Sequence, residues 1–368
     1  MPRLAPPLLR QARRHSRHLL SLLTECRDLE SAKNELRWLT EHARHLQSPD
    51  GHKLWQRSLA GFVRRRAQGE PLQYIIGDQP FGDLEILCRP EVLIPRPETE
   101  TYSRSIASLL EALGRSGHLL PPELKVLDLC SGTGCIGLLL HSLLRRPPFH
   151  ATSTKRLLVT GIDVSDVALK LACQNLEHNI RLGLLQPEAR QQVSFQHADL
   201  LGSAEQLLRG HALSKSGLYD VIISNPPYIS PTDYAAGGRV TRSVRDYEPL
   251  LALVPPHMGD DQGNRADIFY SRILHVGRLA RTRLICMEVG DAAQAARVAR
   301  LAEQFSTDYA GNVEAQIVEV WCDDGHVSEV DVSHLYQYHV RGCERAVVIW
   351  KGAWAHWRRS VSGAQVCS

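Results

Sequence analysis

Residues 126–137 read Val-Leu-Asp-Leu-Cys-Ser-Gly-Thr-Gly-Cys-Ile-Gly, an apolar strand that runs into a glycine turn and then into a helix. Gly132 and Gly134 lack a Cβ, so the backbone there can approach a ligand closely, and the helix that follows offers free N–H groups at its start. The pattern predicts a site for a nucleotide-type cofactor. Because Gly132, Gly134 and Gly137 also match a dinucleotide fingerprint, the glycines alone do not separate NAD from S-adenosylmethionine.

Apolar runs alternate with helical stretches in the part of the chain that follows residue 120. Such alternation predicts an α/β domain with a largely parallel sheet, whose ligands bind at the carboxyl ends of the strands. Seven strands are predicted, at 124–129, 157–162, 193–195, 219–224, 284–289, 313–320 and 346–350.

Three of the predicted strands end near a carboxylate, namely Asp128, Asp163 and Asp199. Asp163 closes the second strand, where it is placed to accept hydrogen bonds from ribose hydroxyls. The alternative is that Asp163, Ser165 or Asp166 caps the next helix. Asp199 is a candidate to hold an adenine amino group while Leu200 packs on the ring, and the alternative is an ordinary turn residue.

The fourth predicted strand ends in Asn225, Pro226, Pro227 and Tyr228. The prolines fix the backbone, so the Asn225 side chain and the Pro226 carbonyl are held in a defined direction at the edge of the sheet. Two acceptors placed in this way suit an amide or amino group, which presents two N–H donors, and they aim the nitrogen lone pair at an electrophilic methyl group. Tyr228 can pack against the planar group.

These motifs resemble the class I S-adenosylmethionine-dependent methyltransferases that act on exocyclic or amide nitrogen. Four further stretches resemble the protein-(glutamine-N5) methyltransferases of the HemK/PrmC type, within a match that spans about residues 60–300. They are Gly-Glu-Pro-Leu-Gln-Tyr-Ile-Ile-Gly at 69–77, Val-Leu-Ile-Pro-Arg-Pro-Glu-Thr-Glu at 92–100, Tyr-Glu-Pro-Leu-Leu-Ala-Leu at 247–253 and Met-Glu-Val-Gly at 287–290.

The resemblance implies a Rossmann-like fold with a seven-stranded sheet, and methylation of the glutamine amide in the Gly-Gly-Gln loop of a peptide-chain release factor. It implies that the cofactor is bound by Cys130, Ser131, Gly132, Thr133, Gly134, Asp163, Leu200 and Asn225. It also implies that the substrate glutamine is held by Asn225, Pro226, Pro227 and Tyr228. Asp128 and Asp199 are added to the cofactor contacts from the physical argument. Residues 95–100 are expected to line the mouth of the site, and the alternative is a purely structural role as a rigid clasp between the domains.

The sequence departs from the family pattern in three places. Cys130 and Ser131 stand where many bacterial members have Gly-Thr, although Gly132 and Gly134 are kept. The loop at 254–265 is longer and looser than usual, and residues 321–342 resemble an insertion before the final strand. No function is transferred to these two regions.

The chain is predicted to have three parts, a helical domain at 1–70, a β-hairpin linker at 71–100 and a methyltransferase domain at 101–368. In the linker, 74–76, 84–87 and 92–94 are β-prone. Residues 1–24 contain five arginines and no acidic residue, which is the charge signature of a mitochondrial presequence. We therefore expect a mitochondrial protein, with the cytoplasm as the alternative, in which this stretch is only a basic helical surface.

Composition limits the substrates and partners that the chain is expected to bind. The 368 residues contain 43 Lys and Arg against 40 Asp and Glu, a near-neutral balance that does not favour nucleic acid as the substrate. No apolar run approaches the roughly 18 residues that a membrane span needs. Nine cysteines without a C-x-x-C pair predict core thiols, a reducing compartment and no metal site. A monomer is expected by default.

Three other functions remain open at this stage, two of them enzymatic. A DNA or RNA adenine-N6 methyltransferase would present the same two N–H donors to Asn225, but it needs a basic groove that the charge balance does not supply. A noncatalytic scaffold could keep the fold and bind only its partner. A dehydrogenase is less favoured, because nothing else typical of hydride transfer accompanies the glycine turn.

Overall fold

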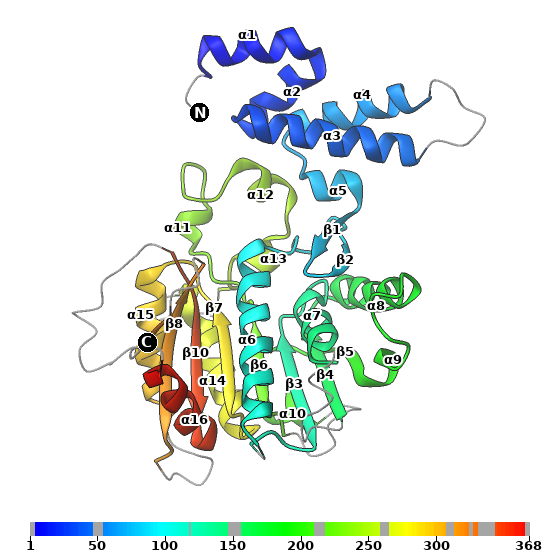
Figure 1. Cartoon of the computed structure of the whole chain (residues 1–368). Helices are drawn as coiled ribbons and strands as arrows, with labels where there is room; N and C mark the ends of the chain where they lie inside the picture. The colour runs from blue at the N-terminus through cyan, green and yellow to red at the C-terminus, as the bar shows by residue number, and fades with distance from the viewer. Residues whose placement is uncertain are drawn as a thin grey trace.

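The computed structural model describes residues 4–46, 54–117, 119–145, 156–209, 218–257, 265–306, 313–323, 327–329 and 343–364. An eight-stranded sheet forms its centre, and a group of helices lies at one end of the molecule (Figure 1). The strands of the large sheet are β3 (Glu123–Leu129), β4 (Arg156–Asp163), β5 (Val193–His197), β6 (Val221–Ser224), β7 (Leu284–Glu288), β8 (Gln316–Cys322), β9 (Val327–Glu329) and β10 (Glu344–Lys351).

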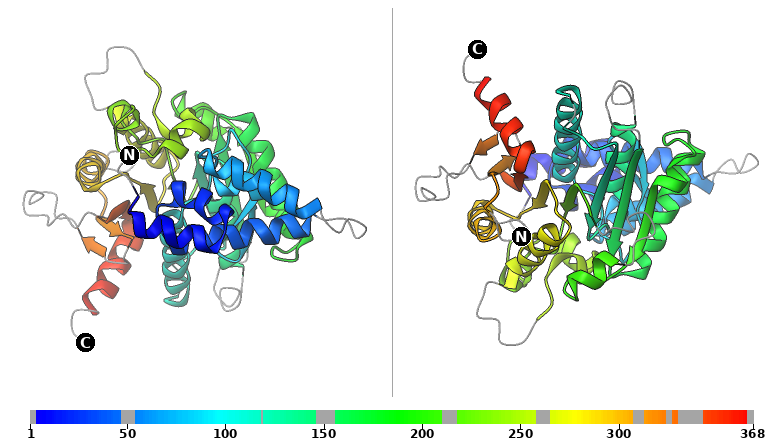
Figure 2. Two further views of the ribbon diagram at one scale, coloured as in Figure 1. Left: turned by 90° about the horizontal axis from the view of Figure 1, so that it is seen from above. Right: turned by 90° about the horizontal axis from the view of Figure 1, so that it is seen from below.

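Helices flank this sheet on both faces. One face carries α6 (Pro97–Arg115), α7 (Cys135–Leu144), α8 (Asp166–Arg181) and α16 (Gly352–Ala364), and the other carries α10 (Ala204–Arg209), α14 (Ile268–Leu279) and α15 (Ala292–Glu303). The view from below in Figure 2 shows α6 and α14 on opposite sides of the strands. Two further short pieces are α9 (Ala189–Gln192) and the 3₁₀ turn η2 (Arg265–Asp267).

The strand order is β5-β4-β3-β6-β7-β10-β8-β9. β3 pairs in parallel with both β4 and β6, whereas β10 runs antiparallel to β7 and β8. The chain therefore winds outward from β3 to β5 and then crosses to the other side of β3. Ligands of such sheets bind outside the carboxyl ends of the strands at this reversal. The seven predicted strands are present, and β9 adds a short strand at the edge.

Alternating side chains of each strand enter two separate cores. On β7, Leu284 and Cys286 pack on the face covered by α6, while Ile285 and Met287 pack on the face covered by α14. This period of two explains why the sheet is built from continuous apolar runs, since both faces are buried. Four of the eight described cysteines are buried, in line with the core thiols predicted, whereas Cys173 is exposed.

The helices at the end of the molecule have a core of their own. They are α1 (Pro6–His15), α2 (Arg17–Cys26), α3 (Leu29–His45) and α4 (Leu54–Ala67). Leu19, Leu22 and Leu23 of α2 are buried against α3 and α4. Side chains define two of the helix starts, since Ser16 accepts a hydrogen bond from Leu19 N and Asp28 accepts one from Ser31 N.

The linker differs in part from its prediction. β1 (Asp78–Phe81) and β2 (Leu84–Leu87) form the expected antiparallel hairpin. The β-prone stretch 74–76 is instead helical, within α5 (Leu72–Ile76), because Pro71 precedes the helix and Gly77 ends it in the left-handed conformation at φ 101°. Residues 92–94 are not a strand either, because they cross to the start of α6 without a partner strand.

Two asparagines of α8 bind the hairpin to the large sheet domain. Asn179 accepts from Glu85 N and donates to Glu85 O, and Asn175 accepts from Leu87 N. Asn175 also donates to Thr133 O in the glycine turn. Both side chains are buried and act as a partner strand for β2, so the hairpin and the glycine turn are held by the same helix.

A segment with three short helices lies between the large sheet and the terminal helices. It contains α11 (Pro231–Tyr234), α12 (Arg242–Tyr247) and α13 (Leu250–Leu253), and Figure 1 shows it between the sheet and α1–α4. The Ser243 hydroxyl donates to Gly69 O at 2.6 Å. No helix within the described ranges is long and apolar enough to cross a membrane.

The hairpin attachment can be tested by substitution of Asn179→Ala. This change removes a buried side chain and leaves the half-buried Glu85 N–H and C=O groups without their partner, so the free energy of unfolding is expected to fall by about 1–3 kcal/mol in urea denaturation. Lys170→Ala, at an exposed position of the same helix, is the control and is expected to change it by less than about 0.5 kcal/mol. Equal effects would show that the hairpin does not depend on Asn179.

Candidate active site

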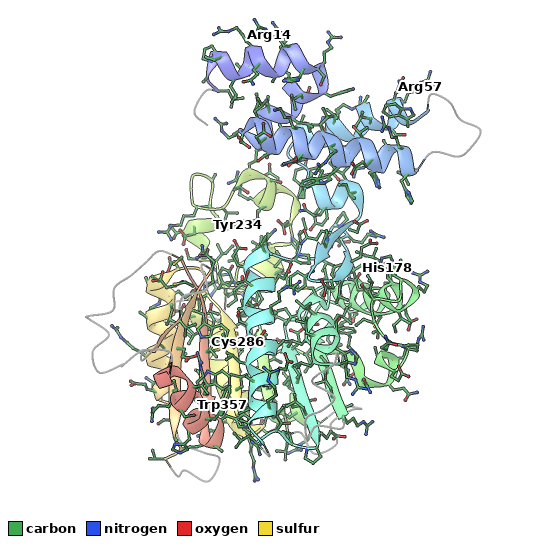
Figure 3. All side chains as sticks on the ribbon, viewed as in Figure 1. Arg14, Arg57, His178, Tyr234, Cys286 and Trp357 are labelled. Atoms are coloured by element: carbon green, nitrogen blue, oxygen red, sulfur yellow. The ribbon has the colours of Figure 1, made fainter. Side chains whose placement is uncertain are left out.

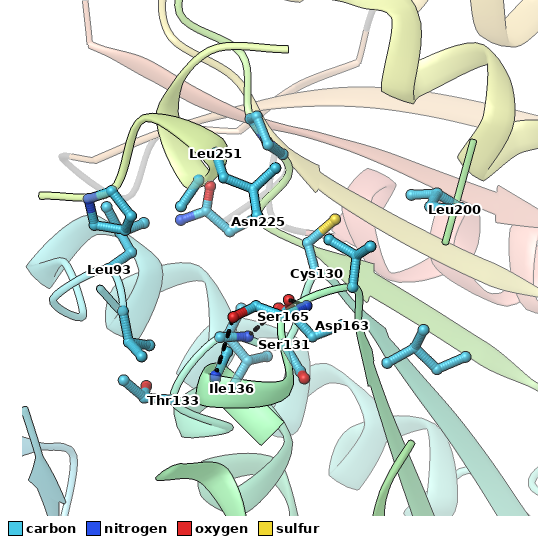
Figure 4. Close-up of a pocket in the computed structure, with 18 of the residues that line it drawn as sticks. Leu93, Cys130, Ser131, Thr133, Ile136, Asp163, Ser165, Leu200, Asn225 and Leu251 are labelled. Atoms are coloured by element: carbon cyan, nitrogen blue, oxygen red, sulfur yellow. Dashed lines mark hydrogen bonds between the residues drawn. The ribbon is translucent and has the colours of Figure 1, made fainter. Parts of the chain in front are cut away.

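A cavity of about 210 Å³ lies at the carboxyl ends of β3, β4 and β6, at the reversal in strand order. Its walls come from the glycine turn after β3, the ends of β4 and β6, the linker and α13. The predicted site residues in its lining are Cys130, Ser131, Gly132, Thr133, Asp163, Asp199, Leu200, Asn225 and Pro227. Figure 4 shows Asn225 beside Leu251, with Ser131 and Asp163 at the glycine turn.

The glycine turn follows β3 with three left-handed residues, Cys130, Gly132 and Gly134, at φ 60°, 54° and 77°. A Cβ on Gly134 would lie 2.7 Å from the Phe195 ring, so only glycine fits there. A Cβ on Gly132 would meet nothing within 4 Å, so its backbone is open to the cavity. The turn therefore forms a backbone cradle beside the cavity, and its two glycines serve different purposes.

Asp163 holds this cradle in place from the end of β4. Its Oδ2 accepts from Gly132 N at 2.8 Å, and its Oδ1 accepts from Ser165 N at 2.9 Å. Burial raises the pKa of Asp163, and these backbone hydrogen bonds oppose the rise. The cap of α8 is Ser165, which accepts from Ala168 N, so the carboxylate of Asp163 faces the cavity rather than capping that helix.

Asp128 lies outside the cavity lining, fully buried beneath the turn. Its Oδ2 accepts from Gly137 N at 3.0 Å, and its Oδ1 has no hydrogen-bond partner. Burial raises the pKa of Asp128 to about 8. The side chain thus supports the start of α7 from below. Gly134 and Pro226, which were also expected at the site, are absent from the lining as well.

The third strand end contributes an exposed carboxylate and a buried leucine. Asp199 and Leu200 both line the cavity, and Asp199 Oδ1 accepts from Leu201 N at 2.9 Å. An acceptor next to an apolar side chain suits the edge and the face of a purine ring. The adenine contact expected of these two residues from the sequence stays a prediction.

Asn225 is fixed by hydrogen bonds to two other elements. Its Nδ2 donates to Thr99 Oγ1 at 3.2 Å, and Thr99 donates to Glu288 Oε2 at 2.5 Å. Tyr228 donates to the other oxygen, Glu288 Oε1, at 3.0 Å. Burial raises the pKa of Glu288, and the hydroxyls of Thr99, Tyr102 and Tyr228 oppose the rise.

A second cavity of about 230 Å³ adjoins the first. Tyr228 lies in its lining, together with residues of the segment that contains α12 and α13. Leu93, Arg96, Asn225 and Ala252 line both cavities. Asn225 therefore lies at the junction of the two cavities. A side chain at this position can contact one molecule in each cavity.

The linker supplies the wall near this junction. Pro95, Arg96 and Thr99 line the first cavity, as expected for residues 95–100. Glu248 fixes them, because its carboxylate accepts from Arg96 at 2.7 Å and from Ile94 N at 3.2 Å. Sequence reasoning missed the remaining wall, which includes Leu251, Ala252 and Phe269. The family-like stretch at 247–253 was a signal for Leu251 and Ala252, and no pattern in the sequence pointed to Phe269.

Curated proteins similar to this chain share one activity in their names. The Schizosaccharomyces pombe protein "Probable MRF1 mitochondrial N(5)-glutamine methyltransferase mtq1" is 33% identical over 298 residues, which cover 80% of this chain and 87% of that protein. The Saccharomyces cerevisiae protein "Mitochondrial MRF1 N(5)-glutamine methyltransferase MTQ1" is 37% identical over 255 residues, covering 69% and 68%.

A bacterial relative and a solved structure extend the comparison. The release factor glutamine methyltransferase of Koribacter versatilis is 34% identical over 201 residues, covering 54% of this chain and 57% of that protein. The N-terminal domain of human METTL16 aligns with 86% of this chain and 92% of that chain, at 16% identity and a TM-score of 0.44. No family model matches the chain.

Substitution of Asp163→Ala is expected to weaken binding of S-adenosylmethionine by at least about 10-fold, because it removes the carboxylate that is expected to accept from the ribose and leaves Gly132 N without its acceptor. The dissociation constant is measured by calorimetry. Asp166→Ala, exposed three residues later and outside the lining, is the matched control. Unchanged affinity in the Asp163 variant would remove this carboxylate from the cofactor site.

The raised pKa of Asp128 predicts a pH-dependent stability. Between about pH 4 and 8 the unfolded chain has released this proton while the folded chain keeps it, so rising pH favours unfolding. Asp128→Asn removes this effect. The measured quantity is the free energy of unfolding of the Asp128→Asn variant minus that of the unsubstituted protein, from urea denaturation. Between pH 5 and 7 this difference is expected to rise by up to about 1.4 kcal/mol per pH unit. A difference independent of pH would contradict the protonated state.

Proposed function

Because this chain belongs to the family of release factor N5-glutamine methyltransferases, we propose that it methylates the side-chain amide of a glutamine in a mitochondrial release factor. The methyl donor is S-adenosylmethionine. The observation that supports this reaction best is the position of Asn225 between two adjoining cavities. One cavity then holds the donor and the other holds the glutamine.

The residues of the first cavity fit the donor. The open backbone at Gly132 leaves room for its amino acid part, Asp163 can accept from the ribose, and Asp199 with Leu200 can hold the adenine. The two carboxylates also suit a ligand with a positively charged sulfur. We assign the remaining contacts to Cys130, Ser131, Thr133 and Asn225, which line the same cavity.

The substrate amide binds at the junction. S-adenosylmethionine supplies a methyl group on an electrophilic sulfonium. Asn225 Oδ1 accepts one N–H group of the glutamine, and we assign the other to the carbonyl of the next residue, Pro226, although Pro226 itself is in neither cavity lining. This pair of acceptors turns the nitrogen lone pair toward the first cavity. Tyr228 packs against the planar amide from the second cavity.

An amide nitrogen is a weak nucleophile, so orientation must supply much of the rate. A well-aligned pair of reactants gains up to roughly 7–11 kcal/mol relative to free encounter. The two acceptors also stabilise the positive charge that develops on nitrogen as it is methylated. No strong base is needed, because the surplus proton can leave after the transfer.

The substrate segment we propose is the Gly-Gly-Gln loop of the release factor. Glycine neighbours allow the glutamine to reach a junction that is enclosed by the linker and by α13. The curated relatives are named for glutamine methylation, which does not favour an adenine-N6 activity, and the paired acceptors give no support to a noncatalytic scaffold.

We propose that helices α1–α4 contact the body of the release factor. Residues 1–70 contain 14 Lys and Arg against 7 Asp and Glu, whereas the rest of the chain has more acidic than basic residues. Figure 3 shows Arg14 and Arg57 at the outside of these helices. A basic unit beside the site favours an acidic face on the partner.

The activity is tested by incubation of the purified protein with S-adenosylmethionine and a folded mitochondrial release factor. Peptide mass spectrometry is expected to find one added methyl group, on the glutamine of the Gly-Gly-Gln sequence. Asn225→Ala should lower kcat by roughly 100-fold with donor affinity nearly unchanged.

Gln174→Ala, an exposed amide on α8, is the control and should keep full activity. Donor binding without methylation of the release factor would contradict the substrate. Full turnover by the Asn225 variant would contradict the mechanism.

A further inference from the structure

The hydrogen-bond chain behind Asn225 has a fixed direction. A buried Glu288 carboxylate can only accept hydrogen bonds, so the Thr99 hydroxyl donates its one proton to Glu288 Oε2. Thr99 Oγ1 then has only lone pairs left for a third group. Whatever faces it from Asn225 must be an N–H donor, and this group is Nδ2 at 3.2 Å.

We propose that Thr99 and Glu288 are positioning residues that set the orientation of the Asn225 amide, so that Oδ1 and not Nδ2 faces the substrate nitrogen. This inference rests on the proposed function of the site. An amide in the opposite orientation would present N–H groups to the N–H groups of the glutamine and would repel it. The free side chain of an asparagine has no strong preference between the two orientations, so a partner must impose one.

The positions of these hydrogen-bonded residues in the fold support this role. Thr99 comes from the first turn of α6, Glu288 ends β7 and Asn225 follows β6, so three elements meet behind the acceptor. Thr99 and Glu288 are each only 2% exposed. In such surroundings a charge-assisted hydrogen bond polarises the next one, which makes Asn225 Oδ1 a stronger acceptor.

The same carboxylate fixes the second wall of the junction. Glu288 Oε1 accepts from the Tyr228 hydroxyl, and Gly290 leaves space for the ring, since a Cβ there would lie 3.1 Å from Tyr228 Cδ2. Gln294 Nε2 donates to Tyr228 O. One buried acid therefore controls both side chains that we place against the substrate amide, Asn225 through Thr99 and Tyr228 directly, with one oxygen for each.

The test compares Thr99→Val, which is close in shape but has no hydroxyl, with Thr99→Ser, which keeps it. Thr99→Val is expected to lower kcat about 10- to 100-fold, with the KM for the release factor and the affinity for S-adenosylmethionine changed less than about 3-fold. Thr99→Ser is expected to keep kcat within about 3-fold. Thermal unfolding and donor binding confirm that each variant is folded.

Glu288→Gln tests the other end of this hydrogen-bond series. The amide of a glutamine can donate to Thr99 Oγ1, and the Thr99 hydroxyl would then be free to donate toward Asn225. The kcat of this variant is expected to fall about 10-fold or more. The double variant Thr99→Val with Glu288→Gln should be no slower than the slower single variant, because the two residues act as one unit.

Three outcomes would overturn the inference: unchanged kcat in a folded Thr99→Val protein, equal losses in the valine and serine variants, or multiplicative losses in the double variant. These outcomes are distinct from failure of the proposed function. If the proposed function failed, the unsubstituted protein itself would leave the release factor unmethylated.

Discussion

The parallel pairing of β3 with β4 on one side and β6 on the other is the constraint on which the site depends. It brings Gly132, Asp163 and Asn225 to one edge of the sheet, although they are far apart in sequence. Backbone hydrogen bonds between the strands set the spacing of these three residues, so the pairing fixes where the cavity lies. Two carboxylates then act on this frame, Asp163 on the glycine turn and the buried Glu288 on the acceptor.

Much of this frame could be predicted from the sequence, because strands buried on both faces appear as continuous apolar runs. The fold class and the strands after residue 120 follow from that signal. The linker shows where local preference fails. Residues 74–76 are β-prone, yet Pro71 and Gly77 delimit a helix there, and residues 92–94 find no strand to pair with.

The site was predictable where it is local and not where it depends on distant contacts. The acidic strand ends and the Asn-Pro-Pro-Tyr sequence could be found as short patterns. The link from Thr99 to Glu288 joins residues 189 positions apart, so no spacing in the sequence could show it. Asp128 shows the converse, since a carboxylate at a strand end can support the turn from below without facing the ligand.

The burial of α2 also restricts how the protein can mature. Leading segments that direct import are often removed by a protease. Removal of residues through Cys26 would take Leu19, Leu22 and Leu23 out of the helical core and expose the apolar faces of α3 and α4. A mature protein with this helical core intact therefore keeps α2, and loss of α1 as well would remove Ala12, which is buried in the same core.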